Sequence, residues 1–306
     1  MVARLAVFPA IDASQGARLV AAAALGGPVP SPWARHTVAD YDAVIEHPDV
    51  EAVYIPLPND LHLTWALRAA DAGKHVLCEK PLAASVEAAQ QMRTRCDSAG
   101  VLLAEAWMTP FDRRWERTFD LVADGLIGTV TEVTTAFTFA IGPDAAHNYR
   151  WRPEHGGGAL LDVGIYCLGP SVRLWGTEPT GVEARVQLAA SGVDAATEVE
   201  LSWPGGQLAR ARCSFVDAEQ QRLELVGTAG VLTLDGDAHT GGKRATTIQH
   251  LDDAGVHHIS VEPDDPYRRM IDAFAAAVRG IQPWPRPVES SIAMLELMTR
   301  IRDAAR

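Results

Sequence analysis

The sequence of 306 residues has few cysteines, no basic cluster and no long apolar run, and each absence excludes a class of protein. Its four cysteines, Cys78, Cys96, Cys167 and Cys213, form no C-x-x-C pair, which predicts a reduced, cytoplasmic protein without disulfides or a structural zinc site. The ten histidines show no H-E-x-x-H spacing, so we expect no metal site. No apolar run approaches the ~20 residues that span a bilayer. A signal peptide is not expected either.

The charge balance is acidic. The chain has 27 Lys and Arg residues against 39 Asp and Glu residues, a net charge of −12. Because no segment of clustered Lys and Arg offsets this charge, neither a nucleic acid nor an anionic membrane is expected as a partner. A hydrophobic fraction of 47% predicts a globular protein.

The first third of the chain alternates between strand-like and helix-like segments. Its strand candidates are short, continuous apolar runs, typical of strands buried on both faces of a parallel sheet. They lie at residues 17–24, 51–56, 75–78 and 101–104. Helical patterns at 60–72 and 85–99 lie between them. This alternation predicts a doubly wound α/β domain.

The pattern changes near Trp107 to long segments in which apolar and polar residues alternate. Short Gly or Asp turns join these segments, which predicts a large open, mostly antiparallel sheet with one covered face. Two helices near 266–280 and 288–304 close the chain. We therefore expect two domains, an α/β domain over residues 1–106 and an α+β domain over 107–306.

One candidate for chemistry is Lys80. It follows the apolar run 75–78 and precedes Pro81, so it lies at the carboxyl end of a predicted buried strand. Ligands of open α/β sheets bind beyond such strand ends, and a partly desolvated lysine there has a pKa suited to proton transfer. The alternative is a surface lysine that merely follows a strand.

A second candidate is the run Gly156-Gly157-Gly158 with Asp162 and Tyr166 behind it. Glycines before a helix let backbone amides approach a ligand, and residues four apart share a helix face. The alternative is an Asp that favours the first helical turn and a Tyr that packs in the core. A third segment, 54–62, fits either a ligand loop or a helix cap at Asn59 or Asp60.

Together these segments resemble the glucose–fructose oxidoreductase, inositol dehydrogenase and rhizopine-catabolism family (Gfo/Idh/MocA). The resemblance includes Glu79-Lys80-Pro81 and Glu105-Ala106-Trp107-Met108 and extends to the C-terminus. It implies a Rossmann-like dinucleotide-binding domain and a substrate domain whose open sheet often serves for homo-oligomerisation. It also implies hydride transfer between NAD or NADP and a small molecule, usually a sugar, a polyol or a related alcohol.

The resemblance also implies roles for single residues. Lys80 matches the catalytic lysine, Asp162 matches a helix carboxylate, and Tyr166 stands where members carry His or Tyr. A lysine and a phenol would relay a proton, and Tyr is more like the sugar-reductase and dihydrodiol-dehydrogenase side of the family. Residues where members line the nicotinamide pocket are Pro56, Asn59, His62, Glu79, Pro81, Trp151 and Arg152.

The sequence departs from the family at its beginning. Members start with a strand and a G-x-G-x-x-G turn, but the first glycine here is Gly16, and we expect residues 2–13 to be helical. The broken segment 25–32 also offers no carboxylate for the ribose. This predicts an N-terminally shortened Rossmann-like sheet, in which the strands at 17–24 and 51–56 either close up or leave backbone groups in need of partners. Dinucleotide affinity should fall accordingly.

Three functions remain open from the sequence. The first is an oxidoreductase of this family, either with an altered cofactor site or with a true start upstream of Met1. Alternatively, the chain is a cofactor-independent acid–base enzyme, such as a lyase, isomerase or cyclase. The third possibility is a non-catalytic binding protein on the same fold.

Overall fold

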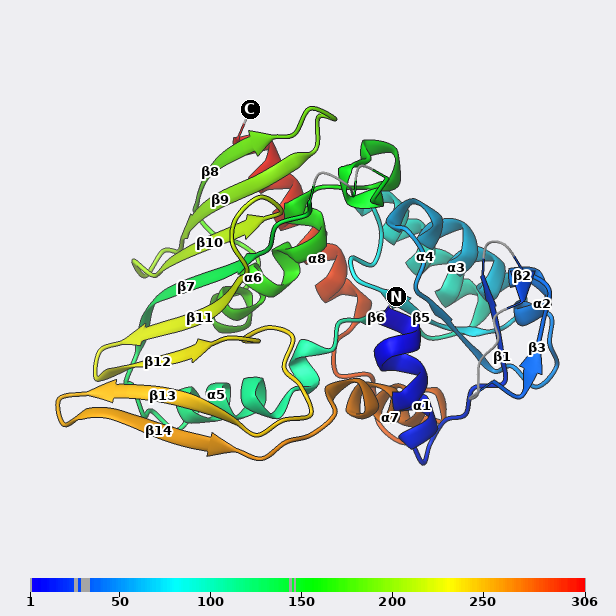
Figure 1. Cartoon of the computed structure of the whole chain (residues 1–306), viewed down its shortest axis with the longest axis horizontal. Coiled ribbons are helices and arrows are strands. Elements are labelled where there is room, and N and C mark those ends of the chain that lie inside the picture. The colour runs from blue at the N-terminus through cyan, green and yellow to red at the C-terminus, as the bar shows by residue number, and fades with distance from the viewer. Residues whose placement is uncertain (1, 25–26, 29–33, 143–144, 146, 306) are drawn as a thin grey trace. The chain divides into compact units, whose positions relative to one another are not determined.

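The computed structural model describes residues 2–24, 27–28, 34–142, 145 and 147–305 (Figure 1). The chain divides into two compact units. The N-terminal unit comprises Met1–Trp107 and Tyr267–Ile292, and the large-sheet unit comprises Met108–Pro266 and Ala293–Arg306.

These units differ from a division at residue 106 in that helix α7 (Pro266–Val278) lies, from Tyr267 onward, in the N-terminal unit. Side chains tie this helix to the start of the chain. The Ser14 hydroxyl donates a hydrogen bond to Asp272 Oδ1 at 2.5 Å, and Arg279 donates to the Gly16 carbonyl. These ties join segments more than 250 residues apart, which sequence periodicity does not report.

The N-terminal unit contains two three-stranded sheets, with strand orders β2-β1-β3 and β4-β5-β6. The strands of the second sheet are parallel, as predicted. The expected helix at residues 2–13 is also present, as a π-helical turn Ala3–Val7 that continues into α1 (Phe8–Ala13). The strand bounds are β1 Ala21–Ala24, β2 Gly27–Pro28, β3 His36–Thr37, β4 Ala52–Ile55, β5 His75–Glu79 and β6 Leu103–Ala106.

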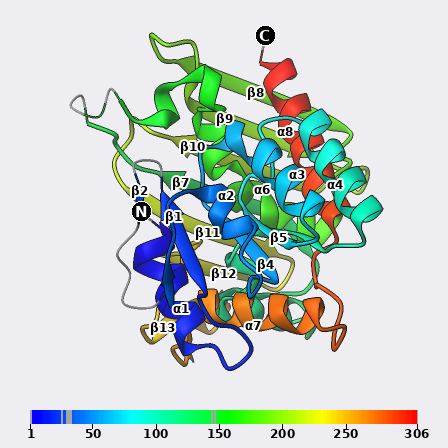
Figure 2. The same ribbon diagram turned by 90° about the vertical axis from the view of Figure 1, so that its right-hand side faces the viewer.

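Helices α3 (His62–Asp71) and α4 (Val86–Ala99) pack side by side against the β4-β5-β6 sheet (Figure 2). The sequence signals at the ends of α4 are confirmed. Ser85 accepts a hydrogen bond from Ala88 N at 3.2 Å, and Gly100 ends the helix with φ +67°. The remaining helices of this part are α2 (Tyr41–Ile45) and the first turn of α8 (Val288–Ala304).

Strands β1 and β4 have not closed up. They belong to different sheets, and a cavity of about 880 Å³ is lined by residues of both. Of the predicted break at 25–32, only Gly27 and Pro28 lie among the described residues, where they form β2.

The large-sheet unit has one eight-stranded sheet in the order β14-β13-β12-β11-β7-β10-β9-β8 (Figure 1). Every pair is antiparallel except β7 and β10, which confirms the predicted mostly antiparallel sheet. The two helices that begin in this unit are α5 (Arg113–Ala123) and α6 (Ala159–Trp175). The strand bounds are β7 Val130–Thr138, β8 Gly181–Leu188, β9 Asp194–Ser202, β10 Leu208–Ser214, β11 Gln220–Gly227, β12 Gly230–Asp235, β13 Thr246–Asp252 and β14 Gly255–Val261.

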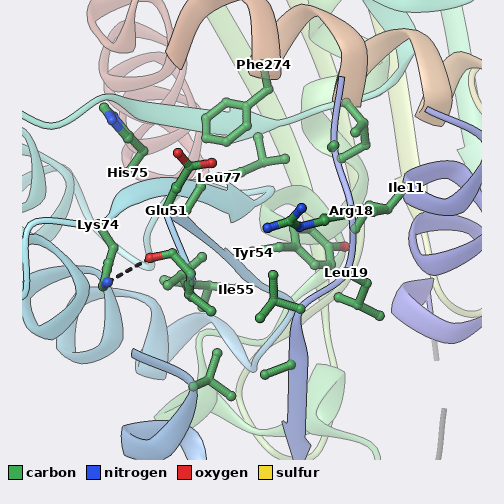
Figure 3. Close-up of a pocket in the computed structure, with 18 of the residues that line it drawn as sticks. Ile11, Arg18, Leu19, Glu51, Tyr54, Ile55, Lys74, His75, Leu77 and Phe274 are labelled. Atoms are coloured by element: carbon green, nitrogen blue, oxygen red, sulfur yellow. Dashed lines mark hydrogen bonds between the residues drawn. The ribbon is translucent and has the colours of Figure 1, made fainter. Parts of the chain in front are cut away.

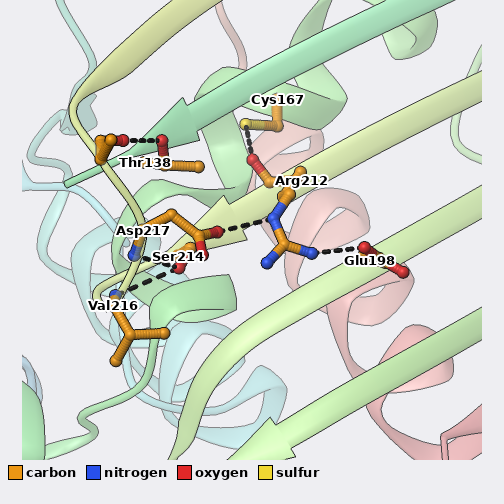
Figure 4. A network of polar contacts seen from close by, with 8 residues as sticks. Thr138, Cys167, Glu198, Arg212, Ser214, Val216 and Asp217 are labelled. Atoms are coloured by element: carbon orange, nitrogen blue, oxygen red, sulfur yellow. Dashed lines mark hydrogen bonds and ion pairs between the residues drawn. The ribbon is translucent and has the colours of Figure 1, made fainter. Parts of the chain in front are cut away.

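Helix α6 packs on one face of this sheet, against β7, β9 and β10. Alternate residues of β10 are therefore buried, namely Ala209, Ala211 and Cys213. Arg210 and Arg212 alternate with them and point to the other face. There Arg212 pairs with Glu198 and with Asp217 (Figure 4). The uncovered face thus carries paired charges rather than an apolar surface.

No helix among the described residues combines the length and the apolar composition needed to cross a membrane.

Candidate functional site

In the N-terminal unit, Lys80 occupies the predicted position, immediately after β5. The preceding residues Val76, Leu77 and Cys78 are at most 1% exposed, so the strand is fixed in the core. Lys80 itself is half-buried, and its peptide bond to Pro81 is cis. The ammonium group of Lys80 therefore belongs to a residue at the carboxyl end of a buried strand.

Glu79 and Tyr54 lie next to this lysine. The Tyr54 hydroxyl donates to Glu79 Oε1 at 2.5 Å, and Lys80 N donates to Glu79 Oε2 at 3.2 Å. Burial raises the pKa of Tyr54, and the neighbouring Glu79 raises it further. Burial also raises the pKa of Glu79. The hydrogen bond from Tyr54 and the charge of Lys80 offset part of this effect of burial on the pKa of Glu79.

The His62 ring contacts the backbone of the loop that contains Lys80. Its ring is fully buried, with Nε2 at 2.9 Å from the Leu57 carbonyl and Nδ1 at 3.1 Å and 3.3 Å from the Pro81 and Leu82 carbonyls. Burial lowers the pKa of His62, although the three carbonyls raise it in part. Because both ring nitrogens face the backbone, His62 holds the loops after β4 and β5 together.

Glu105 is a second brace, and its role was not evident from the sequence. This residue of β6 is 3% exposed and accepts hydrogen bonds from Leu82 N at 2.8 Å and from Ser291 Oγ at 2.7 Å. Arg286 lies at 3.5 Å from the same carboxylate and stacks over the Trp107 ring. The sequence signal was a carboxylate directly after the predicted strand 101–104, but its side-chain partners lie about 180 residues further along the chain.

In the large-sheet unit, Asp162 and Tyr166 lie on α6 as predicted and are both buried. Arg150 joins them: its Nε donates to Asp162 Oδ2 at 2.6 Å. Burial lowers the pKa of Arg150, but Asp162, Tyr149 and Tyr166 outweigh it and raise the net value. The carboxylate at the start of α6 is thus neutralised by a guanidinium that the sequence reasoning did not identify.

His239 is a further buried group near Tyr166. Its ring centroid lies 6.3 Å from that of Tyr166 and 5.8 Å from that of Phe137. Nε2 lies 3.1 Å from the carbonyls of both Ala136 and Arg222, while Nδ1 has no hydrogen-bond partner among the described residues. Complete burial lowers the pKa of His239 to about 4, so the ring is neutral at pH 7.

The expectation that glycine amides before α6 bind a ligand is wrong. Gly157 N donates to the Arg152 carbonyl and Gly158 N to the Arg150 carbonyl, both at 3.0 Å. The first turn of α6 is capped by Asp194, whose Oδ2 accepts from Leu160 N at 2.7 Å. A Cβ atom on Gly157 would lie 2.5 Å from the Arg150 carbonyl, so these glycines permit close chain packing instead.

The other predicted pocket residues have separate environments within their own units. Asn59 is buried at the start of a 3₁₀ turn, Asn59–Leu61, whereas Pro56 is exposed. Trp151 packs edge-on against Phe215 with their ring centroids 5.6 Å apart. The Arg152 guanidinium pairs with the Glu154 carboxylate at a distance of 3.7 Å between nitrogen and oxygen. In the N-terminal unit, the predicted residues that lie together are Lys80 with Glu79 and Pro81, and His62 with Pro81. In the large-sheet unit they are Asp162 and Tyr166 on α6.

One possible metal-binding group occurs among the described residues, where the sequence predicted none. Atoms of His36, His47 and Asp49 lie within 4.8 Å of one another. Asp49 N donates to His47 Nδ1 at 3.2 Å, and His36 and Asp49 are exposed. Sequence spacing did not reveal this group because strand β3 carries His36, whereas the loop after α2 carries His47 and Asp49.

Comparison with family models identifies both parts of the chain. Residues 9–106 match the oxidoreductase family with an NAD-binding Rossmann fold (GFO/IDH/MocA), and residues 115–233 match the GFO/IDH/MocA C-terminal domain. The first match lies within the N-terminal unit, and the second lies within the large-sheet unit.

Several known proteins are similar over most of their length. An uncharacterized oxidoreductase of Rhizobium meliloti is 36% identical over 87% of this chain and 80% of its own length. D-xylose 1-dehydrogenase (NADP⁺) 2 of Haloferax volcanii is 35% identical over 87% and 81%. Among solved structures, a 3-ketoreductase from Actinomadura kijaniata in complex with NADP and TDP-benzene has a TM-score of 0.90 at 26% identity and covers 100% of this chain and 95% of its own.

Proposed function

The chain belongs to the Gfo/Idh/MocA family of NAD(P)-dependent oxidoreductases, and from this membership we propose that it interconverts a secondary alcohol and a carbonyl on a sugar, a polyol or a related small molecule. The enzyme class and the cofactor class, NAD or NADP, follow from the family. The substrate class is supported by relatives whose names specify D-xylose and dTDP-linked hexoses.

The observation that carries the proposal is that buried side chains hold the loop of Lys80 in place. His62 and Glu105 hold the loop after β5 from two sides, and Glu79 lies directly before the lysine. The chemistry that a nicotinamide would supply in this family is hydride transfer at a carbinol carbon. Lys80 would move the accompanying proton at the substrate oxygen, and such a step needs a donor that is held in place.

Tyr166 is proposed as the second member of this proton relay, with Asp162 and Arg150 as the charged pair that orients its surroundings. The phenol is buried, and Phe137 packs against it at a ring distance of 5.2 Å. For the cofactor pocket we propose Pro56, Asn59, Glu79, Pro81, Trp151 and Arg152, as the family resemblance implies. For His62 the proposed role is to position the loop, because its ring nitrogens are engaged.

The described residues lack one part of a dinucleotide site. Residues 1–15 contain no glycine, and Ala3–Ala13 is helical, so no strand–glycine turn–helix unit precedes β1 in the described part of the chain. In Rossmann domains the amides of that unit hold the diphosphate. The residues present therefore do not fit the diphosphate half of the cofactor.

The test compares Lys80→Met with the matched control Lys243→Met in an assay that follows reduced nicotinamide with a panel of pentoses, inositols and dTDP-sugars. Lys243 pairs with Asp265 on the surface, and its side chain is 62% exposed. We expect kcat/KM to fall at least ~100-fold for Lys80→Met and to stay unchanged for the control. Retained activity in Lys80→Met would show that this lysine does not transfer the proton.

A double substitution tests whether Lys80 and Tyr166 serve the same step. If both act on one substrate oxygen, Tyr166→Phe should cost much less activity in the Lys80→Met background than in the wild type. Independent, multiplying losses would instead assign the two residues to different steps.

The second candidate is an acid–base enzyme that uses no dinucleotide, since the helical segment Ala3–Ala13 ahead of β1 does not fit a diphosphate. Titration of the purified protein with NADH and NADPH separates the two. Micromolar binding would eliminate the second candidate, whereas no binding with retained isomerase or lyase activity would support it.

Two further properties are proposed. Homo-oligomerisation through the open face of the large sheet would bury ion pairs such as Arg212–Glu198, so sedimentation velocity should show an oligomer that dissociates at high salt. A cytoplasmic location is supported by the four free, buried cysteines and is tested by cell fractionation.

A further inference from the structure

Two histidines and an aspartate meet at the surface of the N-terminal unit. One ligand atom each from His36, His47 and Asp49 lies within 4.8 Å of the other two. His36 and Asp49 are exposed and His47 is half-buried, so solvent and small ions reach the group. Imidazole nitrogens and carboxylate oxygens are ligands of Zn²⁺ and of similar transition-metal ions.

The two imidazole rings are spaced as two rings around one ion are. Their centroids lie 4.8 Å apart, with 35° between the ring planes. A zinc–nitrogen bond of about 2.0–2.1 Å places a ring centroid ~3.2 Å from the ion, and two such rings at a tetrahedral angle then lie ~5 Å apart. The spacing in this structure therefore needs little adjustment to admit a metal ion.

The backbone holds the three residues in place. His36 belongs to β3, and its N–H donates to the Val20 carbonyl at 2.9 Å. His47 and Asp49 share the turn after α2, which is closed by a hydrogen bond of 3.1 Å from Val50 N to the His47 carbonyl. Ligands on such fixed elements lose less conformational entropy when an ion binds.

Lys74 connects this turn to the start of β5. Its ammonium donates to the Val50 carbonyl at 2.7 Å (Figure 3) and to the His47 carbonyl at 3.4 Å. Lys74 directly precedes His75, the first residue of β5, whose central residues are buried. The turn that carries two of the three ligands is therefore held by its own hydrogen bond and by a neighbouring strand.

The ligand atoms have little competition from other groups. Among the described residues, neither the His36 ring nitrogens nor the Asp49 carboxylate oxygens have a hydrogen-bond or ion-pair partner. Asp49 N donates to His47 Nδ1 at 3.2 Å, the long end of the usual range. This bond is lost if the ion binds Nδ1, and also if the ion binds Nε2, because the ring proton then moves to Nδ1. That loss and the nearby Lys74 ammonium both weaken binding, so we expect micromolar rather than nanomolar affinity.

A second set of two histidines and an aspartate lies in the large-sheet unit and is less suited to a metal ion. His250 and His257 pair across β13 and β14, with ring centroids 5.7 Å apart. His250 is only 6% exposed, and its Nδ1 lies 4.0 Å from Asp252 Oδ2. Asp252 Oδ1 already bonds Ala254 N at 2.8 Å and His257 Nε2 at 3.1 Å. This set therefore supplies a matched control.

We propose that His36, His47 and Asp49 bind one Zn²⁺ ion, with water in the remaining coordination position. The ion links β3 to the turn before β4 and encloses helix α2, which lies between them in the sequence. The site is separate from the proposed proton relay. β4 and β5 are parallel, and the turn precedes β4 whereas Lys80 follows β5, at the opposite edge of that sheet.

The test titrates the full chain with ZnCl₂ in a calorimeter, after metal has been removed with EDTA and dialysis. We expect one site of micromolar affinity. Excess zinc should raise the thermal unfolding midpoint, because an ion that binds only the folded chain stabilises it. Millimolar Mg²⁺ should not displace the zinc, since Mg²⁺ prefers oxygen ligands. No binding, or displacement by Mg²⁺, would overturn the proposal.

Substitutions at exposed positions locate the ion. His36→Phe keeps a ring beside His47 but removes its nitrogens, and Asp49→Asn removes the carboxylate charge. Each variant should bind zinc at least ~10-fold more weakly, with an unchanged circular dichroism spectrum. The control His257→Phe, also at an exposed position, should bind zinc as the wild type does. Unchanged binding by His36→Phe, or equal weakening by His257→Phe, would overturn the proposal.

Proton–nitrogen correlation spectra of the histidine rings identify the ligands directly. On addition of ZnCl₂, the ring nitrogen signals of His36 and His47 should shift, while those of His250 and His257 stay in place. A structural change without coordination would not move the nitrogen signals of these two rings alone. Shifts confined to other histidines would overturn the proposal.

Discussion

The two units of this chain differ in how their sheets are completed. In the large-sheet unit, eight strands form one uninterrupted ladder, with α6 packed on one face. In the N-terminal unit, two three-stranded sheets are separated at β1 and β4, which both border a cavity. The N-terminal unit therefore has fewer backbone pairings to hold its strands in register.

Side-chain ties between distant segments take over part of this task in the N-terminal unit. Ser14 bonds Asp272, Glu105 bonds both Leu82 N and Ser291, and His62 holds two loops. Each tie is buried or half-buried, and the Ser14–Asp272 and Glu105–Ser291 bonds connect segments that no shared ladder connects. We therefore expect that removing one such tie lowers the free energy of unfolding more than removing a charge from the surface of the continuous sheet.

The largest effect is expected from Glu105→Gln. The substitution leaves the Arg286 guanidinium buried without a counter-charge, and burial already lowers the pKa of Arg286. Breaking a buried ion pair on one side costs roughly 3–5 kcal/mol. Urea unfolding should show this loss in free energy, and hydrogen exchange should speed up at Leu82.

Glu289→Gln is the matched control for this comparison. Glu289 pairs with Arg93 at 3.6 Å, but its side chain is 62% exposed. An exposed pair contributes at most ~1 kcal/mol, so the control should unfold nearly as the wild type does. Equal losses in the two variants would contradict the view that buried ties hold this unit.

The next effect concerns pH and lies in the large-sheet unit. His239 has a folded pKa of about 4, below its ordinary value of 6.5. As the pH falls from 6.5 toward 4, His239 therefore becomes protonated in the unfolded chain while it stays neutral in the folded chain. The stabilisation is complete above pH 6.5 and declines by roughly 3 kcal/mol by pH 4. Denaturation midpoints measured across this range should fall accordingly.

His239→Gln should flatten this pH dependence, because an amide keeps a donor for the Ala136 and Arg222 carbonyls but does not titrate. His258→Gln, at an exposed position of β14, serves as the control and should leave the slope unchanged. If His239→Gln retains the wild-type slope, other groups cause the acid loss.

A smaller effect is expected from Gly158→Ala at the start of α6. Gly158 has φ +117°, and an added Cβ would collide with Oδ1 of Asp194, the residue whose Oδ2 caps the helix. We expect a loss of about 2 kcal/mol or more in unfolding free energy. Gly192→Ala has a similar φ of +90° with no atom near its Cβ, so it isolates the backbone strain at ~1 kcal/mol.

The sequence predicted those parts of the fold that local patterns determine. Apolar runs located β4, β5 and β6, and Ser85 and Gly100 marked both ends of α4. Lys80 was also placed correctly, because a strand end follows from periodicity and proline alone. These features depend on neighbours within a few residues.

Features that depend on distant partners were missed or misread. The glycines before α6 were interpreted as a ligand cradle, but the helix start is capped by Asp194, more than 30 residues further along the chain. Glu105, Arg150 and His239 gained their partners only through folding. No spacing rule reports such contacts, since they depend on which faces meet.

The smallest effect is expected from Arg212→Gln on the open face of the large sheet. Arg212 bonds Asp217 at 2.6 Å and pairs with Glu198, yet its side chain is 36% exposed (Figure 4). Exposed pairs contribute at most ~1 kcal/mol, so unfolding should hardly change. The pKa of Asp217, which the Arg212 hydrogen bond holds below its ordinary value, should rise in an NMR titration. A pKa that rises while stability stays constant would show that the continuous ladder, rather than its surface charges, holds this sheet; a stability loss as large as that of Glu105→Gln would remove the contrast between the two units.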